Sequence, residues 1–222
     1  MLRLIPGSRR SDPPPTEGRR DELLVLAQAV VAGDRAALRT FLAAIVPRLL
    51  RVARRVLGPR HPDEEDVAYE AAYAVVEALS GFRGEGTLLH FACRVGVLTA
   101  MNVRRRDAAQ KRARSRHACD PDSVETDALN PEELAAAGAL APIVRELLDT
   151  LPEPLAEALA LHNMLGYSVQ EVAALSGAPL ETVRSRLRLA KQALRRRVLA
   201  HPLLREAVPI DEWVDDAQEE AQ

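Results

Sequence analysis

The stretch SVQEVAALSGAPLETVRSRLRLAKQALRRRV, residues 168–198, decides the fold of the C-terminal half. Ser168 and Glu171 have the spacing of a capping box, in which the serine hydroxyl and the glutamate carboxylate satisfy free backbone amides of a first helical turn. A helix is therefore expected to begin there. Gly177 suits the left-handed conformation that ends a helix, and Pro179 suits the first turn of the next one. The stretch predicts two helices joined by a tight turn.

The second of these helices is expected to bury one side and to expose basic residues on the others. Its apolar residues recur at spacings of three and four, and so form one stripe: Val183, Leu187, Ala190, Leu194 and Val198. Its other sides carry basic residues with no acidic residue among them: Arg184, Arg186, Arg188, Lys191, Arg195, Arg196 and Arg197. This combination is typical of a helix-turn-helix, whose second helix enters the DNA major groove. An arginine-rich surface helix on an unrelated bundle is the alternative.

The composition favours helices and an intracellular protein. The 222-residue chain is 47% hydrophobic but only 3% aromatic, and its net charge of -2 hides a strong segregation of charge along the sequence. Cys93 and Cys119 are widely separated and indicate neither a disulfide framework nor a zinc site. No apolar run is long enough to span a membrane, and the N-terminus lacks the apolar core of a signal peptide. We therefore expect a cytoplasmic protein with no membrane insertion and no cofactor.

Shifts in composition divide the chain into five parts. They are a disordered tail (1–20), a helical domain (21–106), a linker (107–142), a second helical domain (143–200) and an acidic tail (201–222). Between Cys119 and Glu133 the linker is acidic and has no basic residue. The final part holds the only tryptophan, Trp213, among carboxylates; it would either be solvated or dock on a basic surface.

Four helices are predicted in the first helical domain. Their expected ranges are 21–31, 36–57, 63–79 and 87–106. Pro47 is expected to bend the second helix. Three glycines between Gly81 and Gly86 predict a loop before the fourth helix. That helix is expected to end at Arg104 to Arg106, where a second cationic surface begins.

Carboxylates cluster at the start of the third predicted helix, at Asp63, Glu64, Glu65 and Asp66, with His61 nearby. A metal-dependent nucleic-acid hydrolase could use such a cluster. However, acidic side chains in a first turn are favoured by the helix dipole and require no further explanation. No second set of ligands with metal spacing is present in the sequence. We therefore expect neither a catalytic residue nor a metal site, and an enzyme is kept as the alternative of a different class.

Taken in order, these features resemble the sigma-70 family of bacterial RNA polymerase initiation factors, and within it the extracytoplasmic function (ECF) sigma factors. Residues 151–197 are similar to region 4 of the family almost throughout, including the Leu-Pro opening and the Thr-Val-Arg-Ser-Arg-Leu core. GDRAALRTFL, DEEDVAYEAAY and GFRGEGTLLHF, within residues 33–91, resemble region 2. The family's usual Asp-Leu-Val-Gln-Glu reads Asp-Val-Ala-Tyr-Glu at residues 66–70, and Phe91 stands for a usual tryptophan.

The resemblance implies an all-α protein with two small helical domains joined by an acidic flexible linker. It also implies a non-enzymatic transcription initiation factor that binds promoter DNA and core RNA polymerase, through the clamp helices of the largest subunit and the beta flap. An anti-sigma factor would be a further partner. An autonomous helix-turn-helix regulator is the alternative function, but it leaves the first helical domain unexplained.

The resemblance also implies roles for individual residues. Polymerase contacts are expected from Asp66, Tyr69 and Glu70. Contacts to melted minus-10 DNA are expected from Phe82, Arg83, Gly84, Arg94, Asn102, Arg104 and Arg105. Contacts to the minus-35 element are expected from Thr182, Arg184, Ser185, Arg186, Arg188 and Lys191. Since arginine pairs bidentately with guanine, the recognition helix has the side chains that base readout requires.

Overall fold

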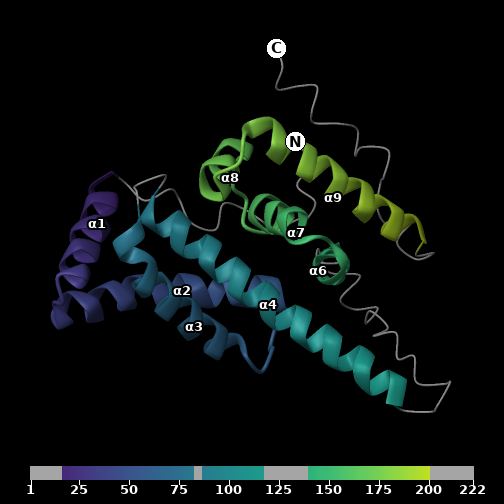
Figure 1. Ribbon diagram of the computed structural model, residues 1–222, viewed down its shortest axis with the longest axis horizontal. Coiled ribbons are helices and arrows are strands. Elements are labelled where there is room, and N and C mark those ends of the chain that lie inside the picture. Colours follow the sequence, from purple (N-terminus) through teal and green to yellow (C-terminus); the bar gives the residue numbers. More distant parts are fainter. Residues whose placement is uncertain (1–16, 83–86, 118–139, 201–222) are drawn as a thin grey trace.

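The computed structural model describes residues 17–82, 87–117 and 140–200, and within these ranges every regular element is a helix. The N-terminal half contains α1 (Glu17–Val31), α2 (Arg35–Leu57), α3 (Glu64–Ala78), a 3-10 turn (Leu79–Gly81) and α4 (Leu88–His117). The C-terminal half contains α6 (Leu140–Thr150), α7 (Glu153–Leu159), a π-helical turn (Ala160–Met164), α8 (Val169–Ser176) and α9 (Leu180–Ala200). The predicted all-α fold is confirmed (Figure 1).

The ends of the N-terminal helices follow from local sequence. The Asp34 carboxylate accepts hydrogen bonds from the amides of Ala36 and Ala37, at 2.7 and 3.2 Å, and so caps α2. Gly58 ends α2 with a φ of 109°, in a region that side-chain-bearing residues rarely adopt. The Thr87 hydroxyl accepts a hydrogen bond from the His90 amide at 3.2 Å, and so caps the start of α4. α2 is continuous through Pro47, and the bend there stays a prediction.

The predicted end of the fourth helix was wrong, because α4 continues eleven residues beyond Arg106 to His117. Residues 107–117 are mostly arginine, alanine, lysine and glutamine, which have high helix propensity. They lack an apolar stripe, so the periodicity that indicated the first part of the helix gave no signal for its continuation. Residues 118–139 of the predicted linker lie outside the described residues, as do residues 1–16 and 201–222 of the two predicted tails. The predicted bounds were wrong at two further places, because α1 already begins at Glu17, within the predicted tail, and α6 begins at Leu140, within the predicted linker.

The core has two parts, and one of them joins the two halves of the chain. The first lies among α1 to α4, where Phe41, Ile45 and Leu49 are 0 to 1% exposed. The second includes the end of α2, Val67 of α3 and residues 93–103 of α4, together with all the C-terminal helices. Here Val56 and Val97 of the N-terminal half belong to the same apolar cluster as buried residues of α6 to α9. Figure 1 shows α4 between α2 and α3 on one side and the C-terminal helices on the other.

None of the described helices combines the length and hydropathy that a bilayer crossing needs.

Candidate nucleic-acid interface

The start of α8 has the predicted capping box. The Glu171 amide donates to the Ser168 hydroxyl at 3.2 Å, and the Ser168 amide donates to the Glu171 carboxylate at 2.8 Å. At the other end Gly177 is left-handed, with a φ of 62°, and its amide donates to the Ala173 carbonyl. Both ends of the short helix are therefore fixed by the residues that predicted it, and the direction in which α9 leaves the turn is fixed with them.

Replacing Ser168 by alanine is expected to lower the free energy of unfolding by about 1 kcal/mol, because the first turn of α8 loses a hydrogen-bond acceptor. Urea denaturation followed by circular dichroism measures this change. Ser176→Ala is the matched control, since that hydroxyl donates to the Val172 carbonyl of its own helix and caps no free amide. Equal losses of stability in the two variants would contradict the capping role of Ser168.

α9 packs through its predicted stripe. The stripe residues are 0 to 4% exposed and contact α6, α7 and α8: Val183, Leu187, Ala190, Leu194 and Val198. Of the residues expected to contact the minus-35 element, Ser185 and Arg188 are exposed, and the others are partly buried: Thr182, Arg184, Arg186 and Lys191. Arg195, Arg196 and Arg197 are exposed in the last turns. The structure thus presents a row of basic side chains along one outer side of a firmly packed helix.

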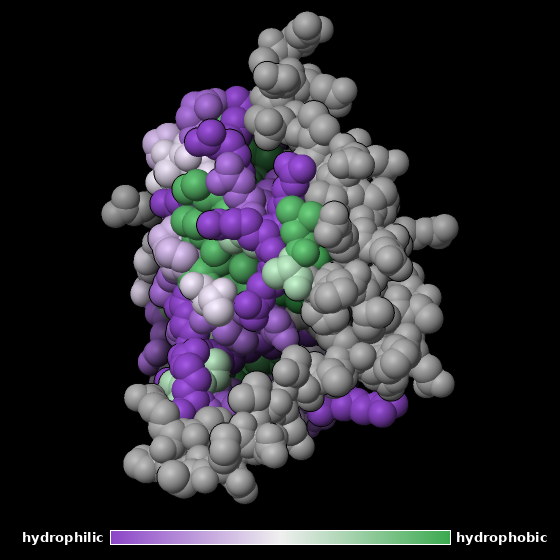
Figure 2. All heavy atoms as spheres, turned by 90° about the vertical axis from the view of Figure 1, so that its right-hand side faces the viewer, coloured by the Kyte–Doolittle hydropathy of each residue, from purple (hydrophilic) through white to green (hydrophobic). Residues whose placement is uncertain are grey.

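Two carboxylates lie against this basic row, at its ends. Glu181, in the first turn of α9, lies 2.5 Å from the Arg184 guanidinium. Arg197 lies 3.3 Å from Glu146 of α6. The expectation of a wholly cationic outer surface was wrong at these positions, because a first-turn glutamate is favoured by the helix dipole and is three residues from Arg184. Figure 2 shows that the described part of the face at the far end of α4 is mainly hydrophilic, with smaller hydrophobic areas.

The residues expected at melted DNA lie on both sides of a gap in the described chain. The Phe82 ring is partly buried, with its centroid 5.4 Å from that of Phe91. Arg83 and Gly84 lie outside the described residues. Asn102 is exposed on α4. The aromatic pair therefore anchors the segment that enters the predicted loop.

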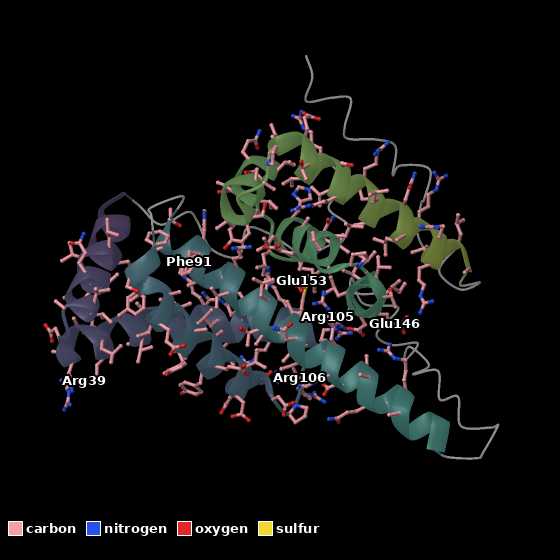
Figure 3. The ribbon with its side chains drawn as sticks, in the orientation of Figure 1. Arg39, Phe91, Arg105, Arg106, Glu146 and Glu153 are labelled. Atoms are coloured by element: carbon pink, nitrogen blue, oxygen red, sulfur yellow. The ribbon has the colours of Figure 1, made fainter. Side chains whose placement is uncertain are left out.

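Three of the four arginines expected at melted DNA, those on α4, are paired with carboxylates of the C-terminal half. Arg94 contacts Glu157 at 2.5 Å, Arg105 contacts Glu153 at 2.9 Å, and Arg104 makes two hydrogen bonds to Asp149, at 2.8 and 2.7 Å. Figure 3 shows Arg105 near Glu153 between α4 and α7, and Arg106 on the other side of α4. These pairings join residues 45 to 63 positions apart, so no sequence pattern indicated them.

Burial raises the pKa of two groups that lie between the halves, Asp149 and Tyr167. Desolvation raises the pKa of the Asp149 carboxyl, although the hydrogen bonds and charge of Arg104 act in the opposite direction. Burial also raises the pKa of the Tyr167 hydroxyl, and the Tyr167 ring packs edge-on against His90 of α4, with 4.7 Å between ring centroids. Forming the ion pairs therefore costs desolvation free energy. Apolar packing contributes much of the free energy that holds the two halves together.

The expected polymerase-binding residues share an exposed side of α3. Asp66, Tyr69 and Glu70 are exposed, and 63% of the Tyr69 surface is accessible. Sequence reasoning missed Tyr73, which is 65% exposed and lies one turn beyond Tyr69. Two large exposed aromatic side chains at a spacing of four residues, beside carboxylates, are typical of a surface that a protein partner covers.

His61, Asp63 and Asp107 come together beside the start of α3. One ligand atom of each lies within 4.8 Å of the others. The Asp63 amide donates to His61 Nδ1 at 3.2 Å, and His61 Nε2 lies 3.3 Å from an Asp107 oxygen. Both ring nitrogens of His61 have protein partners. The cluster is therefore explained by contacts that connect the segment before α3 to α4. The approach of Asp107 was not predicted, because the fourth helix was expected to end before it.

Known proteins are similar over most of the chain. A family model described as "ECF sigma factor" matches residues 21–200. The ECF RNA polymerase sigma-E factor of Escherichia coli (strain K12) is 29% identical over 191 residues, covering 82% of this chain and 95% of the relative. The RNA polymerase sigma-H factor of Pseudomonas aeruginosa is 28% identical over 187 residues, with the same coverage. A solved structure, CnrH in complex with the cytosolic domain of CnrY, is 22% identical with a TM-score of 0.49, covering 81% of this chain and 99% of that one.

Proposed function

The chain belongs to the ECF sigma factor family and is a factor that directs RNA polymerase to promoters, and we propose that its two halves divide this work. The N-terminal half binds core polymerase and melted minus-10 DNA, and the C-terminal half binds the minus-35 element as a duplex. The observation that carries the proposal is the capped helix-turn-helix at α8 and α9, whose second helix buries one complete stripe and turns its basic residues outward.

The C-terminal half is suited to duplex DNA. The recognition residues lie on α9: Thr182, Arg184, Ser185, Arg186, Arg188 and Lys191. Arg188 is exposed between Arg184 and Lys191, in the middle of the row that faces away from the core. An arginine in this position supplies the fork of donors that fits guanine in the major groove. Arg195 and its two neighbours lie farther along the helix, where contacts to phosphate are favoured over contacts to bases.

The N-terminal half is suited to a protein partner and to single-stranded DNA. The exposed side of α3 supplies Asp66, Tyr69 and Glu70 for the clamp helices of the polymerase largest subunit. Phe82 gives a partly buried aromatic ring beside the loop expected to receive a flipped base. Arg83 and Gly84 of that loop, together with Arg94, Asn102, Arg104 and Arg105, complete the surface for melted DNA.

Other partners follow from the family. We propose that an anti-sigma factor regulates the chain and that the beta flap of polymerase contacts its C-terminal half. The proposed role is that of a non-enzymatic factor, and it places the chain in the cytoplasm because its partners, the polymerase and genomic DNA, are there.

A mixing experiment separates this function from an autonomous helix-turn-helix regulator. The purified chain is added to promoter DNA with and without core polymerase, and binding is followed by mobility shift. We expect tight promoter binding only with core present, since the minus-10 surface acts on DNA that the polymerase melts. Equal promoter binding without core would favour the autonomous regulator.

Replacing Asp66 by alanine is expected to weaken binding to core polymerase about tenfold, because a carboxylate at the centre of a protein interface loses its partner. The measurement is a titration of labelled core against the full chain. Glu22→Ala is the control, since Glu22 is also an exposed carboxylate but lies on α1. DNA binding by the isolated chain should be the same in both variants; a loss of core binding in the control alone would overturn the assignment of α3.

A further inference from the structure

A large apolar side chain points outward from the middle of the proposed recognition helix. Leu189 lies on α9, and 44% of its surface is exposed in the part of the chain that the structure describes. The other side of α9 carries the buried stripe that packs on α6, α7 and α8. Single exposed leucines are common on protein surfaces. A role for Leu189 therefore has to follow from its position relative to the DNA that α9 is proposed to bind.

That position follows from the geometry of the helix. Successive residues of an α-helix are about 100° apart, so Ser185, Leu189 and Gln192 lie within about 60° of one another, opposite the buried stripe. All three are exposed. Figure 1 shows α9 at the edge of the molecule, with α6 and α7 on its inner side. Ser185, Leu189 and Gln192 therefore form the outer line of α9, the part of the helix farthest from the core.

Basic side chains lie on both flanks of the outer line, which itself carries no charge. By the same geometry Arg186 lies on one flank, and Arg188 and Arg195 lie on the other. A helix in the major groove turns its outer line toward the base edges and its flanks toward the two phosphate backbones. A long arginine on a flank can reach a base edge or a phosphate. The shorter Leu189 side chain can contact only the base in front of it.

Thymine is the base that offers an apolar group to a leucine in the major groove. Its C5-methyl group lies on the groove edge, whereas guanine, adenine and cytosine present hydrogen-bond donors or acceptors there. Packing Leu189 on one of those polar edges would remove it from water without supplying a hydrogen bond, which costs free energy. Packing on the methyl group buries apolar surface of both molecules. Leu189 therefore favours thymine and disfavours the other three bases.

We propose that Leu189 determines part of the promoter specificity of this chain, by packing on the C5-methyl group of one thymine in the minus-35 element. The inference rests on the proposed function of α9, and it adds an apolar contact to those expected from the basic residues. It requires a T·A pair, with the thymine on either strand, in front of the middle of the helix. Leu189 contributes to the choice of sequence and not to general DNA affinity, because an uncharged side chain has no attraction for phosphate.

The test removes the methyl group from the DNA and the leucine side chain from the protein. Holoenzyme is assembled from core polymerase and the full chain, and its affinity for a cognate promoter is measured by mobility shift. Each thymine of the minus-35 element, on both strands, is replaced in turn by deoxyuridine, which lacks only the methyl group. The series is repeated with Leu189→Ala and Leu199→Ala. Leu199 is the matched control, because it is 45% exposed and lies about 15 Å farther along the same helix.

We expect the loss of one methyl group to weaken binding about fourfold in the unmodified chain and in Leu199→Ala, which is the factor that burial of a group of this size contributes. In Leu189→Ala the same substitution should have no effect, because the two partners of one contact are not additive. An equal loss at that thymine in Leu189→Ala, or no loss at any thymine in the unmodified chain, would overturn the inference. Urea denaturation verifies that each variant is folded. Failure of the proposed function is detected separately, as a failure of the unmodified chain to bind the promoter together with core polymerase.

Discussion

Replacing Arg188 by alanine is expected to reduce transcription from a cognate promoter about 5- to 150-fold, with binding to core polymerase unchanged. The side chain is exposed in the middle of the basic row of α9. One bidentate arginine–guanine pair gives about 1–3 kcal/mol of discrimination, and about 1.4 kcal/mol corresponds to a factor of ten. Run-off transcription with reconstituted holoenzyme, paired with a core pull-down, measures the two properties separately.

Two further variants separate base reading from general charge. Arg39→Ala removes an exposed arginine from α2, which points away from the C-terminal helices in Figure 3, and should leave transcription unchanged. Arg188→Lys keeps the charge but loses the fork of donors, so it should resemble Arg188→Ala if the residue reads a base. Full activity of Arg188→Lys would instead indicate a phosphate contact. Equal defects in Arg188→Ala and Arg39→Ala would contradict the assignment of α9 as the recognition helix.

Replacing Leu194 by alanine is expected to lower the free energy of unfolding by about 2–5 kcal/mol, because its side chain is fully buried and a cavity would remain. Leu189→Ala is the matched control on the same helix, since 44% of the Leu189 surface is exposed. The control should change stability by no more than about 0.5 kcal/mol. Urea denaturation of both full-length variants measures the difference.

The Leu194 variant also tests whether the shared core couples the two halves. Leu194 belongs to the same apolar cluster as Val56 and Val97 of the N-terminal half. If the coupling is strong, Leu194→Ala shifts one cooperative transition to lower urea concentration, with an unchanged slope. Two separated transitions, with only the first shifted, would show that the halves unfold independently. A loss of stability equal to that of Leu189→Ala would contradict the packing of α9.

The C-terminal helices could be predicted in detail because their signals are local. The capping box at Ser168 and Glu171 and the left-handed Gly177 act over a few residues, and the α9 stripe follows from spacing alone. Each of these features was predicted correctly because no distant part of the chain is needed to form it. The approach of Glu181 to Arg184 within the first turn was not taken into account, and neither was the approach of Glu146 to Arg197.

The extension of α4 and the π-helical turn after α7 could not be predicted in the same way. The sequence of residues 107–117 has no apolar stripe, so hydrophobic periodicity ended before the helix did. In the π-helical turn the Leu165 amide donates to the Ala160 carbonyl, five residues back. That wider turn has no characteristic sequence signal, and here it accompanies the close packing of Met164 against the N-terminal half.

The contact between the halves was the largest feature missing from the sequence interpretation. Arg104 was predicted to bind DNA phosphate because of its charge and its place in the family pattern, and that role stays a prediction. Its pairing with Asp149, 45 residues away, depends on how the two helical halves pack against each other. Charge alone identifies what a side chain can bind, whereas its partner in the free chain is decided by the fold.

The most direct measurement is transcription of fragmented genomic DNA by purified core polymerase with and without this chain, with sequencing of the RNA 5′ ends. A sigma factor of this family should create a new set of start sites that share one upstream pair of elements about 25 base pairs apart. The Arg188→Ala variant should lose those starts, although it still binds core. An identical set of 5′ ends with and without the chain would contradict the account.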